Sequence, residues 1–305
     1  MKILFCTDGS RQAERAVRFG AQIASVCQAE PSVLGILETA DRKDALAQAL
    51  TAAQDIFKEH ALSAELLTRA GRPVPEIIRY TGENHYDMVV IGAACKKPFW
   101  KFLDPRWMSP MRAYKIIESV EPPVLVVFCD RPALRSILLC TSGADYTDKA
   151  IEFAGKIAQC SGAVVNLFHV MPAPPAIYVD MIRLEQDVHR LLNSNSKLGR
   201  ALRRQKELLE KQGVFGEIRL RHGEVVPELL KELQRFDYDL VVSGSWPAGE
   251  KLHKYVIGDV ARQIVSQAEL PVLVVRTRHG PTKLLRELLS VLLQRFTKKP
   301  GSSKS

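Results

Sequence analysis

The residues best suited to chemistry in this 305-residue sequence are glycines and short polar side chains that follow apolar runs. One apolar run ends in Gly244, Gly249 and Gly258 follow it, and residues 260–267 then have a helical pattern. A strand, a glycine-bearing loop and a helix in this order bring backbone N–H groups to an anion at the helix start. The stretch therefore predicts a site for a phosphate or another anion.

The sequence contains two copies of one pattern. Residues 2–10 match residues 136–144, residues 71–78 match 223–230, residues 86–93 match 238–245, and residues 123–127 match 271–275. Four matches in the same order indicate two tandem copies of a single fold. The first apolar run ends in Thr7 and Asp8 in one copy, and in Thr141 and Ser142 in the other.

Apolar runs alternate with amphipathic segments in both copies. In the first copy we expect helices between strands at residues 2–7, 33–37, 64–68, 88–91 and 124–128. The strands are rich in Val, Ile and Leu, which is typical of a parallel sheet covered by helices on both faces. Pro75 fits the first turn of one helix, and Ser109 with Pro110 predicts the start of the next.

The second copy carries an insertion, and its residues 179–212 predict one long helix. The basic residues of this segment are expected to form a solvated face rather than a binding surface. They are Arg200, Arg203, Arg204 and Lys206.

Composition narrows the class of protein. The chain is 46% hydrophobic and 25% charged, as globular proteins are, and no apolar run approaches the about 20 residues of a membrane-spanning helix. The sequence opens on a strand pattern rather than a signal peptide, so a cytoplasmic location is expected.

The six cysteines show no metal-ligand spacing, and Cys6 and Cys140 are expected to be buried thiols. The net charge of +9 suits several kinds of anionic partner.

With these stretches in view, the chain resembles a tandem universal stress protein, with two copies of the domain in one polypeptide. The resemblance covers residues 2–128 and 136–276. It rests on Thr7-Asp8-Gly9-Ser10, on His169-Val170, and on three stretches present twice, namely Gly-x-x-x-Pro-Glu, Asp-x-Val-Val-x-Gly and Pro-Val-Leu-Val-Val.

The resemblance implies an α/β fold of two tandem open parallel five-stranded sheets, each with strand order 3-2-1-4-5 and with helices on both faces. We expect a first domain at residues 1–130 and a second at residues 131–279. Residues 280–305 are expected to form an amphipathic helix with a disordered basic tail.

The resemblance also implies a ligand site where the strand order reverses, outside the carboxyl ends of the strands. Some members of the family bind ATP there, with an acidic residue after strand one and a glycine loop after strand four, and others do not. The expected nucleotide-binding residues of the second domain are Thr141, Ser142, Val170, Gly244, Ser245, Gly249, Gly258 and Asp259. Those of the first domain are Thr7, Asp8 and Gly92, and the second domain is preferred. The expected ligand is ATP with Mg, and the chain itself is expected to provide no metal site.

The first copy departs from the ATP-binding pattern in its loop. Residues 93–108 contain no glycine, and bulky rings replace the open backbone. These rings, Phe99, Trp100, Phe102 and Trp107, are expected to pack on the partner domain or on another chain. Contact between this basic-aromatic loop and nucleic acid is the weaker alternative.

The second copy departs from the pattern in three places. Pro247 stands where the binders have a second glycine, Ser142 replaces the acidic residue, and Asp259 replaces a hydroxyl at the helix start. A carboxylate at that position stabilises its own helix but repels a phosphate.

The sequence leaves three functions open. The first is a stress-response binding or sensor protein that holds an adenine nucleotide in the second domain. The second is a protein-interaction module without nucleotide, acting through dimerisation or the C-terminal helix, and the third is a slow ATPase. No catalytic residue can be assigned, so an enzyme is not expected. A protein partner or a second copy of the chain is expected and nucleic acid is not, while a membrane-surface helix at residues 283–299 is an alternative.

Overall fold

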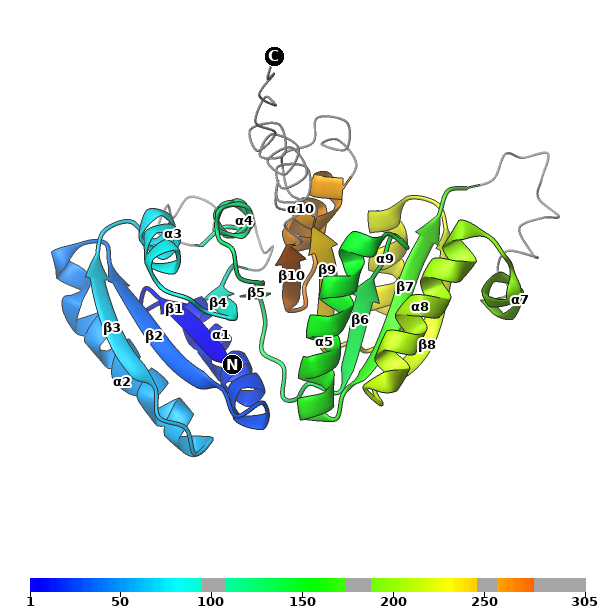
Figure 1. The fold of residues 1–305 in the computed structure, drawn as a ribbon. Helices are drawn as coiled ribbons and strands as arrows, with labels where there is room; N and C mark the ends of the chain where they lie inside the picture. The colour runs from blue at the N-terminus through cyan, green and yellow to red at the C-terminus, as the bar shows by residue number, and fades with distance from the viewer. Residues whose placement is uncertain (95–107, 174–187, 246–256, 277–305) are drawn as a thin grey trace, which may run out of the picture.

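The protein is described by a computed structural model over residues 1–94, 108–173, 188–245 and 257–276 (Figure 1). The first half contains β1 (Lys2–Thr7), α1 (Arg11–Val26), β2 (Glu30–Leu37), η1 (Ala40–Arg42), α2 (Lys43–Glu59), β3 (Glu65–Ala70), α3 (Pro73–Glu83), β4 (Met88–Gly92), α4 (Pro110–Ser119) and β5 (Val124–Val127). The second half contains β6 (Ser136–Cys140), η3 (Asp145–Thr147), α5 (Asp148–Ser161), β7 (Val164–Met171), α7 (Val188–Asn193), α8 (Lys197–Lys211), β8 (Phe215–His222), α9 (Val225–Arg235), β9 (Leu240–Ser245), α10 (Ile257–Gln267) and β10 (Val272–Arg276). The α/β class inferred from the sequence is confirmed.

Each half has the expected strand order. The first half runs β3-β2-β1-β4-β5 with parallel neighbours, and the second half repeats this order as β8-β7-β6-β9-β10. The two sheets are not separate, because β5 and β10 pair antiparallel and join them into one ten-stranded sheet. Leu273 lies opposite Leu125, so the repeated Pro-Val-Leu-Val-Val stretch pairs with its own copy. This pairing satisfies the backbone of two strands that would otherwise be exposed edges.

Successive strand residues point to opposite faces of the sheet, and a layer of helices covers each face (Figure 1). Phe5 and Leu139 belong to the apolar core beneath α1, α2, α5 and α8. Leu4 and Leu138 belong to the core beneath α3, α4, α9 and α10. Both cores run through the two halves, so the sheet and its two cores are continuous across the joint.

The helix starts follow the local sequence signals. The N–H of Ala13 donates to Ser10 Oγ at 3.3 Å at the start of α1. The N–H of Arg112 donates to Ser109 Oγ at 3.3 Å at the start of α4, as Ser109-Pro110 predicted. Both caps lie at the carboxyl edge of the sheet, where the strand order reverses.

Hydrogen bonds and an ion pair link the two halves beside the paired strands β5 and β10. The guanidinium of Arg276, at the end of β10, donates to the carbonyls of Ile117 and Val120 at the C-terminal end of α4, at 3.2 and 3.3 Å. Arg131 in the linker pairs with Asp237 at 3.1 Å. An arginine at a helix C-terminus satisfies carbonyls that have no partner within the helix.

In the described part of the insertion, residues 188–212, the expected long helical stretch is divided into two helices. α7 ends at Asn193, and Ser196 starts α8 by accepting a hydrogen bond from the N–H of Gly199 at 3.0 Å. Arg203 donates to the carbonyls of Leu192 and Ser194 and so fixes the turn between the helices. The expectation of a simple solvated basic face is therefore wrong for Arg203. Within the described residues, no helix has the length and apolarity needed to cross a membrane.

Candidate functional site

The predicted residues of the first half meet at the carboxyl edge of the sheet. Thr7 ends β1, Asp8 follows it, and Gly92 ends β4, which is the parallel neighbour of β1. Thr7 is buried and Asp8 is partly exposed. The structure thus places all three at the reversal of strand order, where the sequence placed them.

Gly92 has a packing reason to be glycine. A Cβ atom at this position would lie 2.1 Å from the carbonyl oxygen of Gln12, in the first turn of α1. The absence of a side chain therefore lets α1 approach β4 closely. A contact between Gly92 and a nucleotide remains a prediction.

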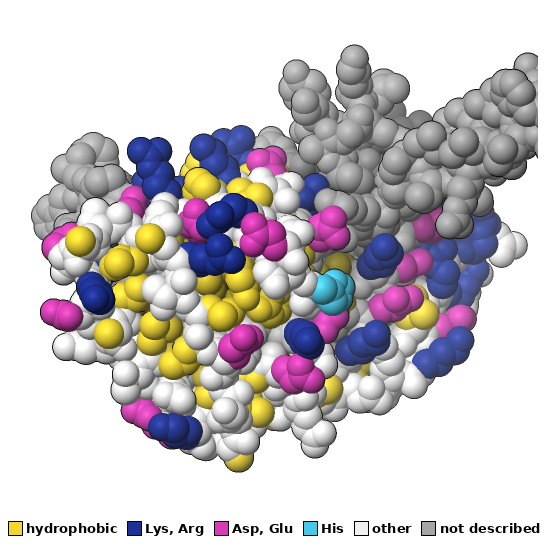
Figure 2. Space-filling view, turned by 60° about the vertical axis from the view of Figure 1, so that its left-hand side comes forward, with side chains coloured by type: hydrophobic (Ala, Val, Ile, Leu, Met, Phe, Trp, Pro, Cys, Tyr) yellow, Lys and Arg dark blue, Asp and Glu magenta, His cyan; other side chains and the backbone are white. Residues whose placement is uncertain are grey.

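A crevice of about 230 Å³ opens beside Asp8, between α3 and α4. Figure 2 shows Lys and Arg side chains along the upper rim of the first half, over the carboxyl ends of its strands. The crevice is lined by Asp8, Glu38, Arg72, Pro73, Val74, Met108, Arg112 and Lys115. We call this set of residues the cation crevice.

The cation crevice has charges of both signs. Arg72 precedes α3, and Arg112 and Lys115 lie one turn apart on the first turns of α4. Asp8 is held in place because its Oδ1 accepts a hydrogen bond from the N–H of Ser10 at 3.0 Å. Guanidinium and ammonium groups bind phosphate oxygens, and a carboxylate accepts hydrogen bonds from hydroxyl or amino groups. The crevice therefore offers complementary groups for a molecule with a phosphate at one end and N–H or O–H donors at the other.

The second half lacks these cations at the equivalent positions. The matching Pro-Glu and Pro-Val-Leu-Val-Val stretches set the correspondence between the halves. By this correspondence Glu224 replaces Arg72, Val260 replaces Arg112 and Gln263 replaces Lys115. The sequence preference for the second half rested on its glycines and did not weigh these side chains.

The predicted residues of the second half lie on neighbouring strands. Thr141 and Ser142 follow β6, Val170 lies near the end of β7, and Gly244 and Ser245 end β9. β6 pairs with both β7 and β9, so these strand ends lie side by side. Gly249 lies outside the described residues. Gly258 and Asp259 fall in the first turn of α10, and the position of the Asp259 side chain lies outside the described residues.

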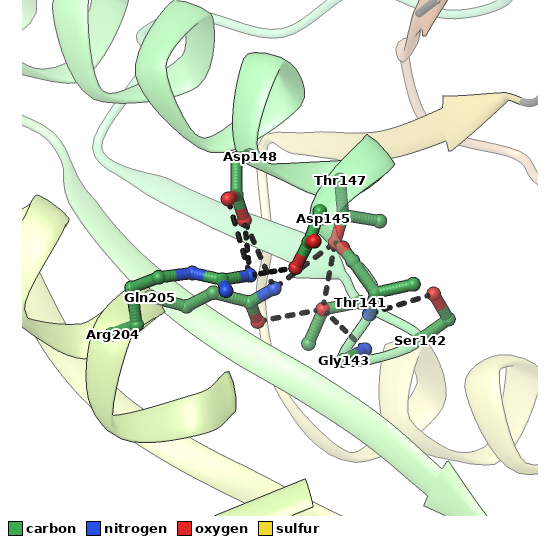
Figure 3. Close-up of polar contacts among 9 residues, drawn as sticks. Thr141, Ser142, Gly143, Asp145, Thr147, Asp148, Arg204 and Gln205 are labelled. Carbon is green, nitrogen blue, oxygen red and sulfur yellow. Dashed lines mark hydrogen bonds and ion pairs between the residues drawn. The ribbon is translucent and has the colours of Figure 1, made fainter. Parts of the chain in front are cut away.

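A buried polar cluster occupies the space beside Thr141, between α5 and α8 (Figure 3). The Thr141 hydroxyl donates to Gln205 Oε1 at 2.7 Å, and Gln205 Nε2 donates to Thr147 Oγ1 at 3.0 Å. Gln205 is fully buried. Beside it, Arg204 pairs with Asp145 at 2.7 Å and with Asp148 at 3.1 Å. Arg204 thus makes a surface ion pair, and its side chain is 43% exposed, in agreement with the expected solvated face.

His169 and the strand cysteines have structural environments. His169 is buried, and its Nδ1 lies 2.8 Å from the carbonyl oxygen of Thr141, to which Nδ1–H donates. Burial lowers the pKa of His169, so the neutral imidazole is favoured. Burial raises the pKa of the Cys6 thiol, and raises that of Cys140 to about 12. Thiols with raised pKa values are poor nucleophiles and poor metal ligands.

Sequence reasoning missed the cation crevice because its members are far apart in the chain. Arg72 and Arg112 come from different helices, and neither belongs to a glycine loop. A usable signal was nevertheless present, because aligning the two halves shows cations at three positions of the first half that are uncharged or acidic in the second. Within the described part of the chain, no three His, Cys, Asp or Glu side chains are grouped so as to hold a metal ion.

The protein is therefore a tandem α/β protein in which each half is doubly wound. The cation crevice lies where the strand order of the first half reverses, which is where open α/β sheets bind ligands. The sequence profile of the universal stress protein family matches residues 1–127 and 133–276, so the chain belongs to that family.

Known relatives agree with this assignment. A universal stress protein of Methanocaldococcus jannaschii is 25% identical over 142 residues, which cover 47% of this chain and 82% of the relative. The crystal structure of a universal stress protein from Archaeoglobus fulgidus has a TM-score of 0.66 at 16% identity, covering 90% of this chain and 98% of that one. A structure from Pseudomonas aeruginosa UCBPP-PA14 in the same family has a TM-score of 0.64 at 19% identity, covering 95% and 97%. At these identities the two structures show the shared fold alone.

Proposed function

We propose that the protein is a stress-response binding protein that holds an adenine nucleotide and acts as a sensor rather than as an enzyme. The observation that carries the proposal is the cation crevice, where Arg72, Arg112 and Lys115 face the same space as Asp8. The crevice lies at the reversal of strand order, where open α/β sheets bind ligands. A bound nucleotide stabilises the fold by mass action and favours the conformation that binds it.

The charges assign a role to each end of the ligand. Arg72 and Arg112 would hold the phosphates, and Asp8 would accept hydrogen bonds from the ribose or the base. Mg would accompany ATP through the phosphate oxygens, since the described residues form no metal-binding cluster of their own.

Calorimetric titration of the full chain with AMP, ADP and ATP, with and without Mg, tests the proposal. Co-purified nucleotide is first removed and identified by denaturing extraction and mass detection. We expect Arg72→Gln and Arg112→Gln each to weaken binding by about 10- to 150-fold, since a charge-assisted hydrogen bond contributes about 1.5–3 kcal/mol. Arg262→Gln removes the same charge from an exposed position on α10 and should leave the affinity unchanged.

The second-half site remains a prediction and has its own test. Asp259→Ser replaces the carboxylate at the start of α10 with a hydroxyl and should strengthen nucleotide binding if that half is the binding half. An effect of Asp259→Ser without an effect of Arg112→Gln would move the site to the second half. A protein that is purified empty and binds none of the three nucleotides would favour the interaction module, and phosphate release above a protein-free control would favour the slow ATPase.

A further inference from the structure

A second cavity, of about 280 Å³, lies on the other face of the first half, between α1 and α2. It is separate from the cation crevice, whose walls come from α3 and α4. Its lining residues are Thr7, Gly9, Ser10, Arg11, Glu14, Val17, Ala49, Ala52, Ala53 and Ile56. We call it the α1–α2 cavity.

The second half shows what occupies the equivalent space there. The N–H of Leu62 donates to the carbonyl of Phe57 after α2, and the N–H of Val214 donates to the carbonyl of Leu209 after α8, at 2.9 and 3.1 Å. Phe57 and Leu209 therefore hold matching positions. Four residues earlier in each helix, Ala53 of the first half corresponds to Gln205 of the second. Two lining residues of the α1–α2 cavity, Ala52 and Ala53, correspond to Arg204 and Gln205, so the side chains of these two residues occupy the equivalent region in the other half.

The hydroxyl that Gln205 satisfies is kept in the first half. Thr7 corresponds to Thr141, since Gly9 N–H donates to Thr7 Oγ1 at 3.1 Å just as Gly143 N–H donates to Thr141 Oγ1 at 3.0 Å. Thr141 also donates its own proton to the Gln205 carboxamide oxygen. Thr7 is only 4% exposed, and no acceptor for its hydroxyl proton is present among the described residues. A buried hydroxyl that faces a cavity without an acceptor favours a ligand that brings one.

The other residues that line the cavity indicate which further chemical groups the ligand should carry. Glu14 corresponds to Asp148, whose Oδ1 lies 3.4 Å from Gln205 Nε2. Both hydrogen bonds from Arg18 to Glu14 end on Oε1, which leaves Oε2 for an N–H donor of a ligand. Arg11 supplies a positive charge at the cavity wall that suits a carboxylate. Val17, Ala53 and Ile56 form an apolar floor.

We propose that the α1–α2 cavity binds a small amino-acid-like molecule with a primary carboxamide, which takes the place that Gln205 fills in the second half. Its carbonyl oxygen accepts from Thr7, its amide nitrogen donates to Glu14, and its carboxylate lies at Arg11. The cavity volume of about 280 Å³ is near the lower end of ligand pockets, about 300–1,000 Å³, so it suits a small metabolite.

The test compares L-glutamine with L-glutamate on the full chain, by thermal shift and calorimetry at millimolar concentrations. The two probes have nearly the same size, but only glutamine has the amide N–H donors. We expect glutamine to raise the melting temperature and glutamate to raise it much less or not at all.

Two variants locate the effect. Ala53→Gln copies the second-half side chain into the cavity and should weaken glutamine binding at least about tenfold without unfolding the protein. Thr7→Val removes the hydroxyl and should weaken binding in the same direction. Ala47→Gln adds the same side chain to an exposed position of α2 and should leave glutamine binding unchanged.

The outcomes are decisive in both directions. Equal responses to glutamine and glutamate, or an unchanged glutamine response in Ala53→Gln, would overturn the proposal. A wild-type protein that responds to neither probe, but becomes more stable in Ala53→Gln, would show that the cavity holds only water. Nucleotide binding at the cation crevice is measured in Ala53→Gln and Ala47→Gln and should not change, so the two sites are tested independently.

Discussion

Ala53 faces an open cavity in the first half, and its counterpart Gln205 is fully buried among hydrogen-bond partners in the second. At two further matching positions the second half has a buried carboxylate or imidazole that the first half lacks, because Glu232 corresponds to Tyr80 and His169 to Gly35. In the second half Gln205, Glu232 and His169 each have hydrogen-bond partners within the chain.

The first half leaves polar groups facing open space on both faces of its sheet. On one face Thr7 lines the α1–α2 cavity, and on the other Asp8 lines the cation crevice. A fold that is present twice can keep one copy as a rigid support while the other presents its polar groups to ligands. The contrast therefore favours the first half as the binding half and the second as the structural half.

Substitution of Glu232 tests this difference between the halves with the largest expected effect. Its carboxylate is fully buried, accepts from Arg221 at 2.5 Å and from the Tyr238 hydroxyl at 3.2 Å, and lies 3.7 Å from Arg219 Nε. Glu232→Ala leaves two arginines without their buried anion and should cost about 3–5 kcal/mol of stability. Urea unfolding measures the loss, and hydrogen exchange should place it in β8 and α9.

The matched change in the first half is Tyr80→Phe. The Tyr80 hydroxyl makes a long contact of 3.4 Å with the Tyr86 hydroxyl, so its loss should cost no more than about 1 kcal/mol. If the two substitutions cost the same, the second half does not depend on its buried charge, and this part of the contrast fails.

Gln205→Ala is the next largest expected effect. It removes the hydrogen bonds to Thr141 and Thr147 and opens a cavity in a packed region, so we expect a loss of about 2–3 kcal/mol. Glu207→Ala, an exposed change on the same helix, should have little effect. A Gln205→Ala protein as stable as the wild type would mean that water fills this space without cost, and the empty cavity of the first half would then need no ligand.

The strands of the two halves could be predicted before the structure was known, but the joint between the sheets and the buried role of Gln205 could not. Apolar runs and the repeat were enough to predict the strands, and the family resemblance supplied their order in each half and the positions of Thr7 and Asp8 at the carboxyl edge. The pairing of β5 with β10 could not be predicted, because ladder partners almost 150 residues apart leave no local signal beyond a repeated apolar stretch. The role of Gln205 was hidden for a related reason. A polar residue in a basic amphipathic helix has the pattern of a solvated face until the packing of α8 on α5 places it inside.

The smallest predicted effect is the pH dependence that His169 confers on the second half. Burial lowers the pKa of His169 in the folded protein below the about 6.5 expected in the unfolded chain. The unfolded state therefore binds the proton more readily, and the free energy of unfolding should fall as the pH drops below about 6.5 and be at its full value above it. Urea unfolding between pH 5 and 8 should show this slope in the wild-type protein. His169→Asn keeps an N–H donor for the Thr141 carbonyl but does not titrate, so its slope should be smaller. Gly35 occupies the equivalent position in the first half and has no titrating group. The change in pH slope between the wild type and His169→Asn should therefore come from the second half. An unchanged slope in His169→Asn, measured against wild type, would assign the pH dependence to carboxylates elsewhere in the chain.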